Sequence, residues 1–165
     1  MPSLSKQRQI IGLAVWLLVS FAASAIGAVA SIQAKTFYGQ LVQPSWAPSP
    51  TVFGPVWTVL FALMGIAAWL VWRSEGFRST RQALMLFLVQ LFFNALWSWL
   101  FFAWQLGALA FADIVLLWVL IAATLVFFWR ITPLAGVLLI PYLLWVSFAG
   151  ALNYALWQLN PQILG

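Results

Sequence analysis

The stretch Trp46-Ala-Pro-Ser-Pro-Thr-Val-Phe-Gly-Pro-Val-Trp57-Thr-Val-Leu-Phe61 combines prolines with aromatic side chains and carries no charge. Proline fixes φ and donates no backbone hydrogen bond. Together with Pro44, which comes just before the stretch, Pro48 and Pro50 therefore exclude a helix before about Thr51. We expect this part of the chain to form a stiff, extended, apolar loop.

A helix is expected to follow this proline-rich loop. Pro55 is compatible with the first helical turn, where a missing N–H leaves no bond unmade. Trp57 and Phe61 then lie four residues apart on one face of that helix. A stiff apolar loop that leads into an aromatic helix face is unusual for a plain membrane anchor.

The composition indicates an integral membrane protein. Of the 165 residues, 65% are apolar and 5% are charged, whereas a soluble domain carries roughly 25% charged residues. The net charge is +5, but the basic residues are scattered between apolar runs, so we interpret them as topology signals and expect no nucleic-acid binding. Cysteine and histidine are absent from the sequence, which removes the usual ligands of zinc and haem iron. We therefore expect no metal site and no resident cofactor.

Five segments are apolar and long enough to cross a bilayer, which takes about 20 helical residues. They cover residues 10–32, 52–72, 83–104, 107–129 and 133–157. They predict an all-α membrane protein in which residues 1–165 form one domain, a bundle of five transmembrane helices. Only Gln105 and Leu106 separate the third and fourth segments, so we expect these two to be antiparallel neighbours.

The first segment also resembles a signal peptide. Lys6 and Arg8 precede the apolar run, and Ala23-Ser24-Ala25 resembles a cleavage site. The apolar run continues to Ala34, however, which is beyond the length of a signal core. We therefore expect the segment to be retained as a span.

Small residues recur at four-residue spacing within this first span, at Ala23, Gly27 and Ser31. Such a stripe lets a second helix approach closely. The sequence leaves open whether that helix belongs to the same bundle or to a second copy of the chain in a homodimer.

The basic residues predict the orientation in the membrane. With five spans, the N-terminal tail, the second-to-third loop and the fourth-to-fifth loop share one side. That side holds Lys6, Arg8, Arg73, Arg78, Arg81 and Arg130, whereas the other side holds Lys35 alone. The positive-inside rule therefore predicts a cytoplasmic (inner) membrane with a cytoplasmic N-terminus and an external C-terminus. An outer membrane is the alternative, and there the rule does not set the orientation.

Polar and aromatic side chains share single faces of three spans, at depths that we estimate from a rise of about 1.5 Å per residue. They are Trp57 and Phe61 on the second span, Asn94, Trp97 and Ser98 on the third, and Trp145, Ala149 and Asn153 on the fifth. All lie in the half of the membrane beneath the proline-rich loop, and Pro141 should kink the fifth span and open space. We expect a pocket here. The alternative is that the amides of Asn94, Asn153 and Gln90 only join helices.

Asp113 is the one formal charge inside a predicted span. Intramembrane acids usually face the bundle interior and are paired. We expect the Asp113 carboxylate to be satisfied by an indole N–H, an amide or the loop backbone, or to reach the interface. A proton-relay role is the alternative.

Several motifs occur in a specific order along the chain. They are Pro44-Ser-Trp-Ala-Pro, Phe53-Gly-Pro-Val-Trp57-Thr, Gln90-Leu-Phe-Phe-Asn94-Ala-Leu-Trp97, and Pro141-Tyr-Leu-Leu-Trp145 through Leu152-Asn153-Tyr154. Over nearly the whole chain, the sequence resembles the TspO/MBR family of tryptophan-rich sensory proteins and translocator proteins. The resemblance implies a five-helix bundle, often dimeric, that binds porphyrins. For animal members it also implies binding of cholesterol and synthetic isoquinoline or benzodiazepine-type ligands.

Carried over position by position, the resemblance implies a ligand pocket. Its residues would be Tyr38, Pro48, Trp57, Phe61, Asn94, Trp97, Ser98, Trp145 and Ala149. Trp57 and Trp145 match the two tryptophans that the family links to light-dependent porphyrin breakdown. A cholesterol-type motif needs a basic residue shortly after a tyrosine, and none follows Tyr154, so strong sterol recognition is not expected.

Three functions follow from the residues and the resemblance. The first is a membrane receptor or sensor for a porphyrin or a similar flat apolar ligand, which would regulate tetrapyrrole or stress responses. The second is a light-dependent porphyrin-degrading enzyme that acts through Trp57 and Trp145, because the sequence offers no nucleophile–base pair for ordinary catalysis. The third is a porphyrin or lipid transporter, although five spans do not divide into two equal repeats.

Overall fold

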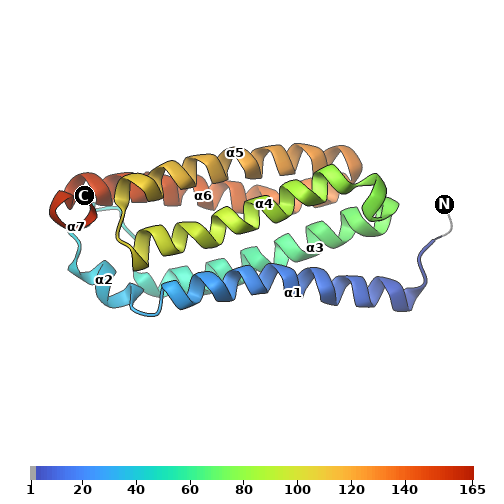
Figure 1. Ribbon diagram of the computed structural model, residues 1–165, viewed down its shortest axis with the longest axis horizontal. Coiled ribbons are helices and arrows are strands. Elements are labelled where there is room, and N and C mark those ends of the chain that lie inside the picture. The colour runs from blue at the N-terminus through green and yellow to red at the C-terminus, as the bar shows by residue number, and fades with distance from the viewer. Residues whose placement is uncertain (1–2) are drawn as a thin grey trace.

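The computed structural model describes residues 3–165, and within that range all regular secondary structure is helical. Five long helices lie side by side (Figure 1): α1 (Lys6–Ala30), α3 (Phe53–Ser79), α4 (Arg81–Ser98), α5 (Gly107–Ile131) and α6 (Pro133–Leu159). The short helices η1 (Pro50–Val52) and η2 (Trp99–Ala103) extend α3 and α4. Each of the five is long and apolar enough to cross a membrane. The predicted five-helix membrane fold is therefore confirmed.

The predicted neighbours also pack together. α4 and α5 contact each other along their length, and the chain reverses between them through Gln105, whose φ is +56°. α5 packs on α6, and α1 packs on both α3 and α4. The start of α1 and the C-terminal residues lie at opposite ends of the bundle (Figure 1).

The helix ends differ from the predicted ends by a few residues. The largest difference is in α3, which runs to Ser79 although its apolar run ends at Trp72. Gly76 has a φ of +76°, so the helical geometry is interrupted there before the chain turns toward α4. Hydropathy did not predict this last part of α3, because the residues after Trp72 are mostly polar.

The connection between α1 and α3 contains a helix that was not predicted, α2 (Ala34–Gln40). The proline loop, residues 41–49, follows α2 and contains no helix, as expected. The Tyr38 hydroxyl donates to the Pro48 carbonyl at 2.9 Å. This bond ties the proline loop back to α2.

A second attachment holds the proline loop to the C-terminal end of the chain. Asn160 lies between α6 and α7 (Pro161–Leu164), and its side chain makes two hydrogen bonds to Val42. Its oxygen accepts from the Val42 N–H at 2.7 Å, and its amide donates to the Val42 carbonyl at 2.8 Å. Asn160 thus pairs with the loop backbone as a neighbouring strand would.

The stripe of small residues on α1 packs inside the bundle. Ala23 and Gly27 are buried, and a Cβ on Gly27 would lie 3.2 Å from the Ser98 hydroxyl oxygen of α4. A similar close approach joins α1 to α3, because a Cβ on Gly65 would lie 2.8 Å from a Leu17 methyl carbon. The sequence left open whether the stripe packs within the bundle or against a second copy of the chain. In the structure it packs against α4 of the same chain.

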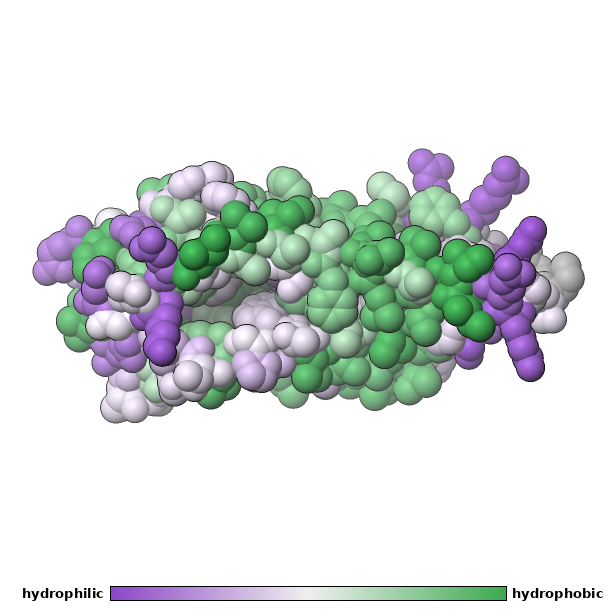
Figure 2. Space-filling model, turned by 90° about the horizontal axis from the view of Figure 1, so that it is seen from below, coloured by the Kyte–Doolittle hydropathy of each residue, from purple (hydrophilic) through white to green (hydrophobic). Residues whose placement is uncertain are grey.

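Hydrophilic residues gather at the two ends of the bundle, and an apolar band separates them (Figure 2). Lys6 and Arg8 at the start of α1 lie at the same end as Arg81 at the start of α4. Exposed leucines, such as Leu18 at 70% and Leu144 at 65%, cover the band between the ends. This surface suits the interior of a bilayer, so the chain is an integral membrane protein.

Candidate functional site

A cavity of about 430 Å³ lies between α1, α3, α4 and α6, at the end of the bundle that carries α2. Its wall is rich in aromatic residues: Phe53, Trp57, Phe61, Trp97, Phe101, Phe102, Trp145 and Phe148. The cavity opens sideways, where the C-terminal half of α1 faces the start of α3. Figure 2 shows this hollow, which is bordered by residues of intermediate hydropathy.

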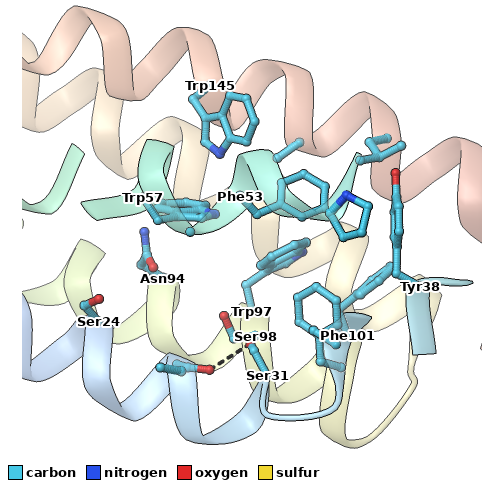
Figure 3. Close-up of a pocket in the computed structure, with 18 of the residues that line it drawn as sticks. Ser24, Ser31, Tyr38, Phe53, Trp57, Asn94, Trp97, Ser98, Phe101 and Trp145 are labelled. Carbon is cyan, nitrogen blue, oxygen red and sulfur yellow. Dashed lines mark hydrogen bonds between the residues drawn. The ribbon is translucent and has the colours of Figure 1, made fainter. Parts of the chain in front are cut away.

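Eight of the nine pocket residues that the resemblance implied line this cavity. They are Tyr38, Trp57, Phe61, Asn94, Trp97, Ser98, Trp145 and Ala149. Pro48 lies outside the lining, and its carbonyl instead accepts the hydrogen bond from Tyr38, which does line the cavity. Figure 3 shows Trp57, Trp97 and Trp145 arranged around one open space, with Asn94 beside Trp57.

The two central tryptophans come from different helices and contact each other. The Trp57 ring of α3 meets the Trp145 ring of α6 at 89°, with centroids 6.5 Å apart. Phe61, one turn further along α3, lies 5.7 Å from Trp57. On the opposite wall, Trp97 and Phe101 stack at 5.4 Å and 18°. The cavity is therefore walled by flat apolar rings.

The indole N–H of Trp145 is buried and has no hydrogen-bond acceptor among residues 3–165. Other indoles of the bundle have acceptors: Trp97 donates to the Asn153 side-chain oxygen at 2.9 Å, and Trp118 donates to the Ser147 hydroxyl at 2.8 Å. An unpaired buried donor costs about 1–3 kcal/mol. In Figure 3 the ring nitrogen of Trp145 points toward Trp57, so this unused donor faces the wall of the cavity.

A chain of hydrogen bonds joins α4 to α6 behind the cavity. The Asn94 amide donates to the Tyr142 hydroxyl, and this hydroxyl donates to the Gln90 side-chain oxygen, both at 2.6 Å. Gln90 does not line the cavity. For this residue the alternative expectation, an amide that only joins helices, therefore agrees with the structure. Asn94 serves both purposes, because its amide holds Tyr142 and its side chain also lines the cavity.

Asn153 connects three helices at the same level. Its oxygen accepts from Trp97 of α4, and its amide donates to the Gly107 carbonyl at the start of α5, at 3.2 Å. The ring of Trp97 is thereby fixed in the cavity wall. The polar groups expected to form a pocket and those expected to join helices are largely the same residues.

Comparison with known proteins agrees with the motifs in the sequence. Residues 13–158 match the TspO/MBR family. The chain belongs to the TspO/MBR family. It is 40% identical to the tryptophan-rich protein TspO of Chlorobaculum tepidum over 159 residues, which cover 93% of this chain and 99% of that protein.

Two further relatives, one bacterial and one human, are also similar to this TspO/MBR chain. A tryptophan-rich sensory protein of Cereibacter sphaeroides is 37% identical over 149 residues, which cover 88% of this chain and 92% of the relative. The human translocator protein is 39% identical over 127 residues, which cover 75% of each chain. The resemblance inferred from the motifs is thus confirmed.

Several lining residues of this TspO/MBR chain were missed by sequence reasoning. Ser24 lies on α1, Ser31 directly follows α1, and Lys35 lies on α2. The sequence analysis assigned none of these three residues to the pocket. Phe101 and Phe102 lie in η2, a turn of π-helix that continues α4. The small-residue stripe on α1 was a usable signal for Ser31, whereas a π-helical turn has no simple sequence pattern.

The expectation that Asp113 is hydrogen-bonded is wrong. Its side chain is 6% exposed, and neither carboxylate oxygen has a hydrogen-bond partner among the residues that the structure describes. Two donors of the expected kinds are used elsewhere, because the Trp97 indole binds Asn153 and the Asn94 amide binds Tyr142. Asp113 also lies outside the cavity lining.

One charge and one phenol lie at the α2 end of the cavity. Lys35 is the only charged side chain among the described lining residues, and it is exposed at this end. Tyr38, one turn further along α2, is 2% exposed, and this burial raises the pKa of its phenol. Tyr38 therefore stays neutral and keeps its proton for the bond to Pro48.

Proposed function

We propose that this TspO/MBR-family chain is a membrane receptor that binds a porphyrin, or a similar flat apolar molecule, in the aromatic cavity. The cavity volume of about 430 Å³ falls within the roughly 300–1,000 Å³ of small-molecule sites. The observation that carries the proposal is that the flat rings of Trp57, Trp97 and Trp145 surround this one cavity. A ligand that shifts the Trp57 ring slightly would reach the buried Trp145 N–H, which has no acceptor among residues 3–165.

The chemistry of the walls supports a planar ring system. Indole and phenyl faces from Trp57, Trp97 and Phe101 offer flat surfaces on which a conjugated macrocycle can stack. The Trp145 N–H supplies a donor, and the Asn94 side-chain oxygen supplies an acceptor. A metal-free porphyrin has ring nitrogens of both kinds. The sequence contains no histidine or cysteine, so a bound haem would lack its commonest axial ligands.

A sensing role fits a site that binds a ligand and offers no nucleophile–base pair. The name of the Cereibacter sphaeroides relative, a sensory protein, supports it. We infer that occupancy of the cavity reports the level of a tetrapyrrole and thereby regulates tetrapyrrole or stress responses. The charge distribution supports a cytoplasmic membrane with the N-terminus in the cytoplasm, which places the cavity in the outer half of the bilayer.

Tryptophan-fluorescence quenching by protoporphyrin in a non-ionic detergent tests the proposal. The test variant is Trp57→Ala/Trp145→Ala, and the matched control is Trp104→Ala/Trp118→Ala, which removes two exposed indoles outside the cavity. Loss of two aromatic contacts should weaken binding about ten-fold or more in the test variant. Equal affinities for the wild type and the test variant would contradict the proposal.

The pair Trp57 and Trp145 also favours a second function, light-dependent porphyrin degradation. The two indoles are adjacent, and the Tyr142 ring lies 6.2 Å from Trp57, so three oxidisable rings lie together at the wall. This function predicts that porphyrin absorbance bands fade under light but not in the dark. Fading at the wild-type rate in Trp57→Phe/Trp145→Phe would rule it out.

A further inference from the structure

Lys35 has no carboxylate side chain of its own chain to pair with. The sequence contains two acidic residues. Glu75 lies near the end of α3, at the opposite end of the bundle, and Asp113 is buried within α5 and lies outside the cavity lining. Among residues 3–165, the Lys35 ammonium group thus stands at the rim of an apolar cavity with no acidic side chain beside it.

Two hydroxyl groups at the same opening are already engaged. The Ser31 hydroxyl donates to the Gly27 carbonyl at 2.9 Å, the bond drawn as a dashed line in Figure 3. The Thr58 hydroxyl, across the opening on α3, donates to the Gly54 carbonyl at 2.8 Å. Lys35 supplies the one charged donor among the described residues that line the cavity.

We infer that the cavity selects flat apolar molecules that carry a carboxylate at one edge, and that Lys35 holds this carboxylate at the opening. The inference rests on the proposed function and specifies its ligand: acid-bearing porphyrins are preferred over their neutral esters. The macrocycle lies between Trp57 and Trp97, and the acid remains at the rim. There the carboxylate keeps part of its hydration, so the ion pair avoids the cost of burying two charges.

The side chain suits this role. Lysine carries a compact charge on a flexible stem, so it reaches a carboxylate without demanding one fixed geometry. Because the rim is exposed, the pair is partly screened by solvent, and its contribution is modest. An alternative role is that Lys35 extends toward lipid headgroups, as lysines near the ends of spans do.

The test combines two ligands with three proteins. Protoporphyrin IX carries two propionates, and its dimethyl ester has the same ring without charge. Dissociation constants are measured by fluorescence quenching in a non-ionic detergent for the wild type, for Lys35→Gln, and for Lys6→Gln. The last variant removes the same charge at the opposite end of the bundle. The ratio of the two constants within each protein is compared between proteins, which cancels the unequal partitioning of the porphyrins into micelles.

The inference predicts that Lys35→Gln lowers the preference for the acid over the ester by about five-fold. The change should come from weaker binding of the acid, should shrink in high salt, and should be absent in Lys6→Gln. An unchanged preference for the acid over the ester in Lys35→Gln would overturn the inference and indicate that Lys35 contacts lipid headgroups instead. Equal weakening of both porphyrins would also overturn it and indicate a structural lysine. If the wild type binds neither porphyrin, the proposed function itself fails.

Discussion

The indole rings of Trp57 and Trp145 meet edge to face at the cavity wall, with their centroids 6.5 Å apart, although the two residues are 88 positions apart in the sequence. Trp57 is fixed at the start of α3, directly after the proline loop, and Trp145 follows Pro141 by one turn of α6. The contact therefore joins the helix that follows the proline loop to the helix that contains Pro141. It also places a fully buried indole N–H that has no acceptor among residues 3–165 beside the site where we propose that a ligand binds.

Replacing Trp145 with phenylalanine should separate stability from binding. The change keeps a ring in the wall but removes the buried, unpaired N–H, which costs about 1–3 kcal/mol in the empty protein. We expect Trp145→Phe to leave the melting temperature in detergent unchanged or higher, while protoporphyrin binds several-fold more weakly. The control Trp118→Phe loses a bond to Ser147 and should show the opposite pattern, with normal affinity. A destabilised Trp145→Phe with normal affinity would contradict this account.

Tyr142 is expected to be important for stability. Its hydroxyl both accepts from Asn94 and donates to Gln90, and its side chain is 1% exposed. Tyr142→Phe leaves both amides without this partner inside the bundle, which should lower the free energy of unfolding by about 1–3 kcal/mol. Tyr154→Phe is the matched control, because Tyr154 is 49% exposed. Equal melting temperatures for the two variants would show that the chain of hydrogen bonds adds little.

Gly65 should tolerate no side chain. A Cβ at this position would lie 2.8 Å from the Leu17 Cδ2 atom and 3.1 Å from the Leu17 Cα atom, so the backbone of α1 would have to move away from α3. We expect Gly65→Ala to destabilise the protein by about 1–3 kcal/mol and to weaken porphyrin binding, since α1 forms one wall of the cavity. Gly39→Ala, which meets no atom within 4 Å, should behave as wild type. A normal melting curve for Gly65→Ala would mean that the contact between α1 and α3 is loose.

The attachment of the proline loop to Asn160 should affect how long a ligand stays bound. Asn160→Ala removes two hydrogen bonds to Val42 and frees the loop from the C-terminal end. We expect a lower melting temperature and faster dissociation of protoporphyrin, measured by stopped-flow recovery of fluorescence. Gln162→Ala, an exposed change in α7, serves as the control. An unchanged rate of protoporphyrin dissociation in Asn160→Ala would show that the attachment of the proline loop does not affect ligand retention.

The five spans were predictable because hydropathy is a strong signal over 20 or more residues. α2 was not, because a helix of seven residues such as Ala34–Gln40 has no long apolar run and is stabilised by burying Phe37 and Tyr38 against other helices. The far end of α3 was missed for a related reason, since its polar residues continue the helix past the apolar run.

The candidate site was predictable where side chains repeat on one helix face, as for Trp57 with Phe61 and for Asn94 with Ser98. It was not predictable where partners come from different helices. Asp113 was expected to be paired because indole and amide donors exist in the bundle, but in the structure the Asn94 amide and the Trp97 indole bind other acceptors. Spacing along one chain segment does not reveal such competition.

A structure of the protein with bound protoporphyrin would show whether the aromatic cavity is the binding site. The macrocycle should lie between the Trp57 and Trp97 rings, with a ligand acceptor within hydrogen-bond distance of the Trp145 Nε1 atom. A porphyrin bound on the outer surface of the helices, with the cavity empty and the Trp145 N–H still unpaired, would contradict it.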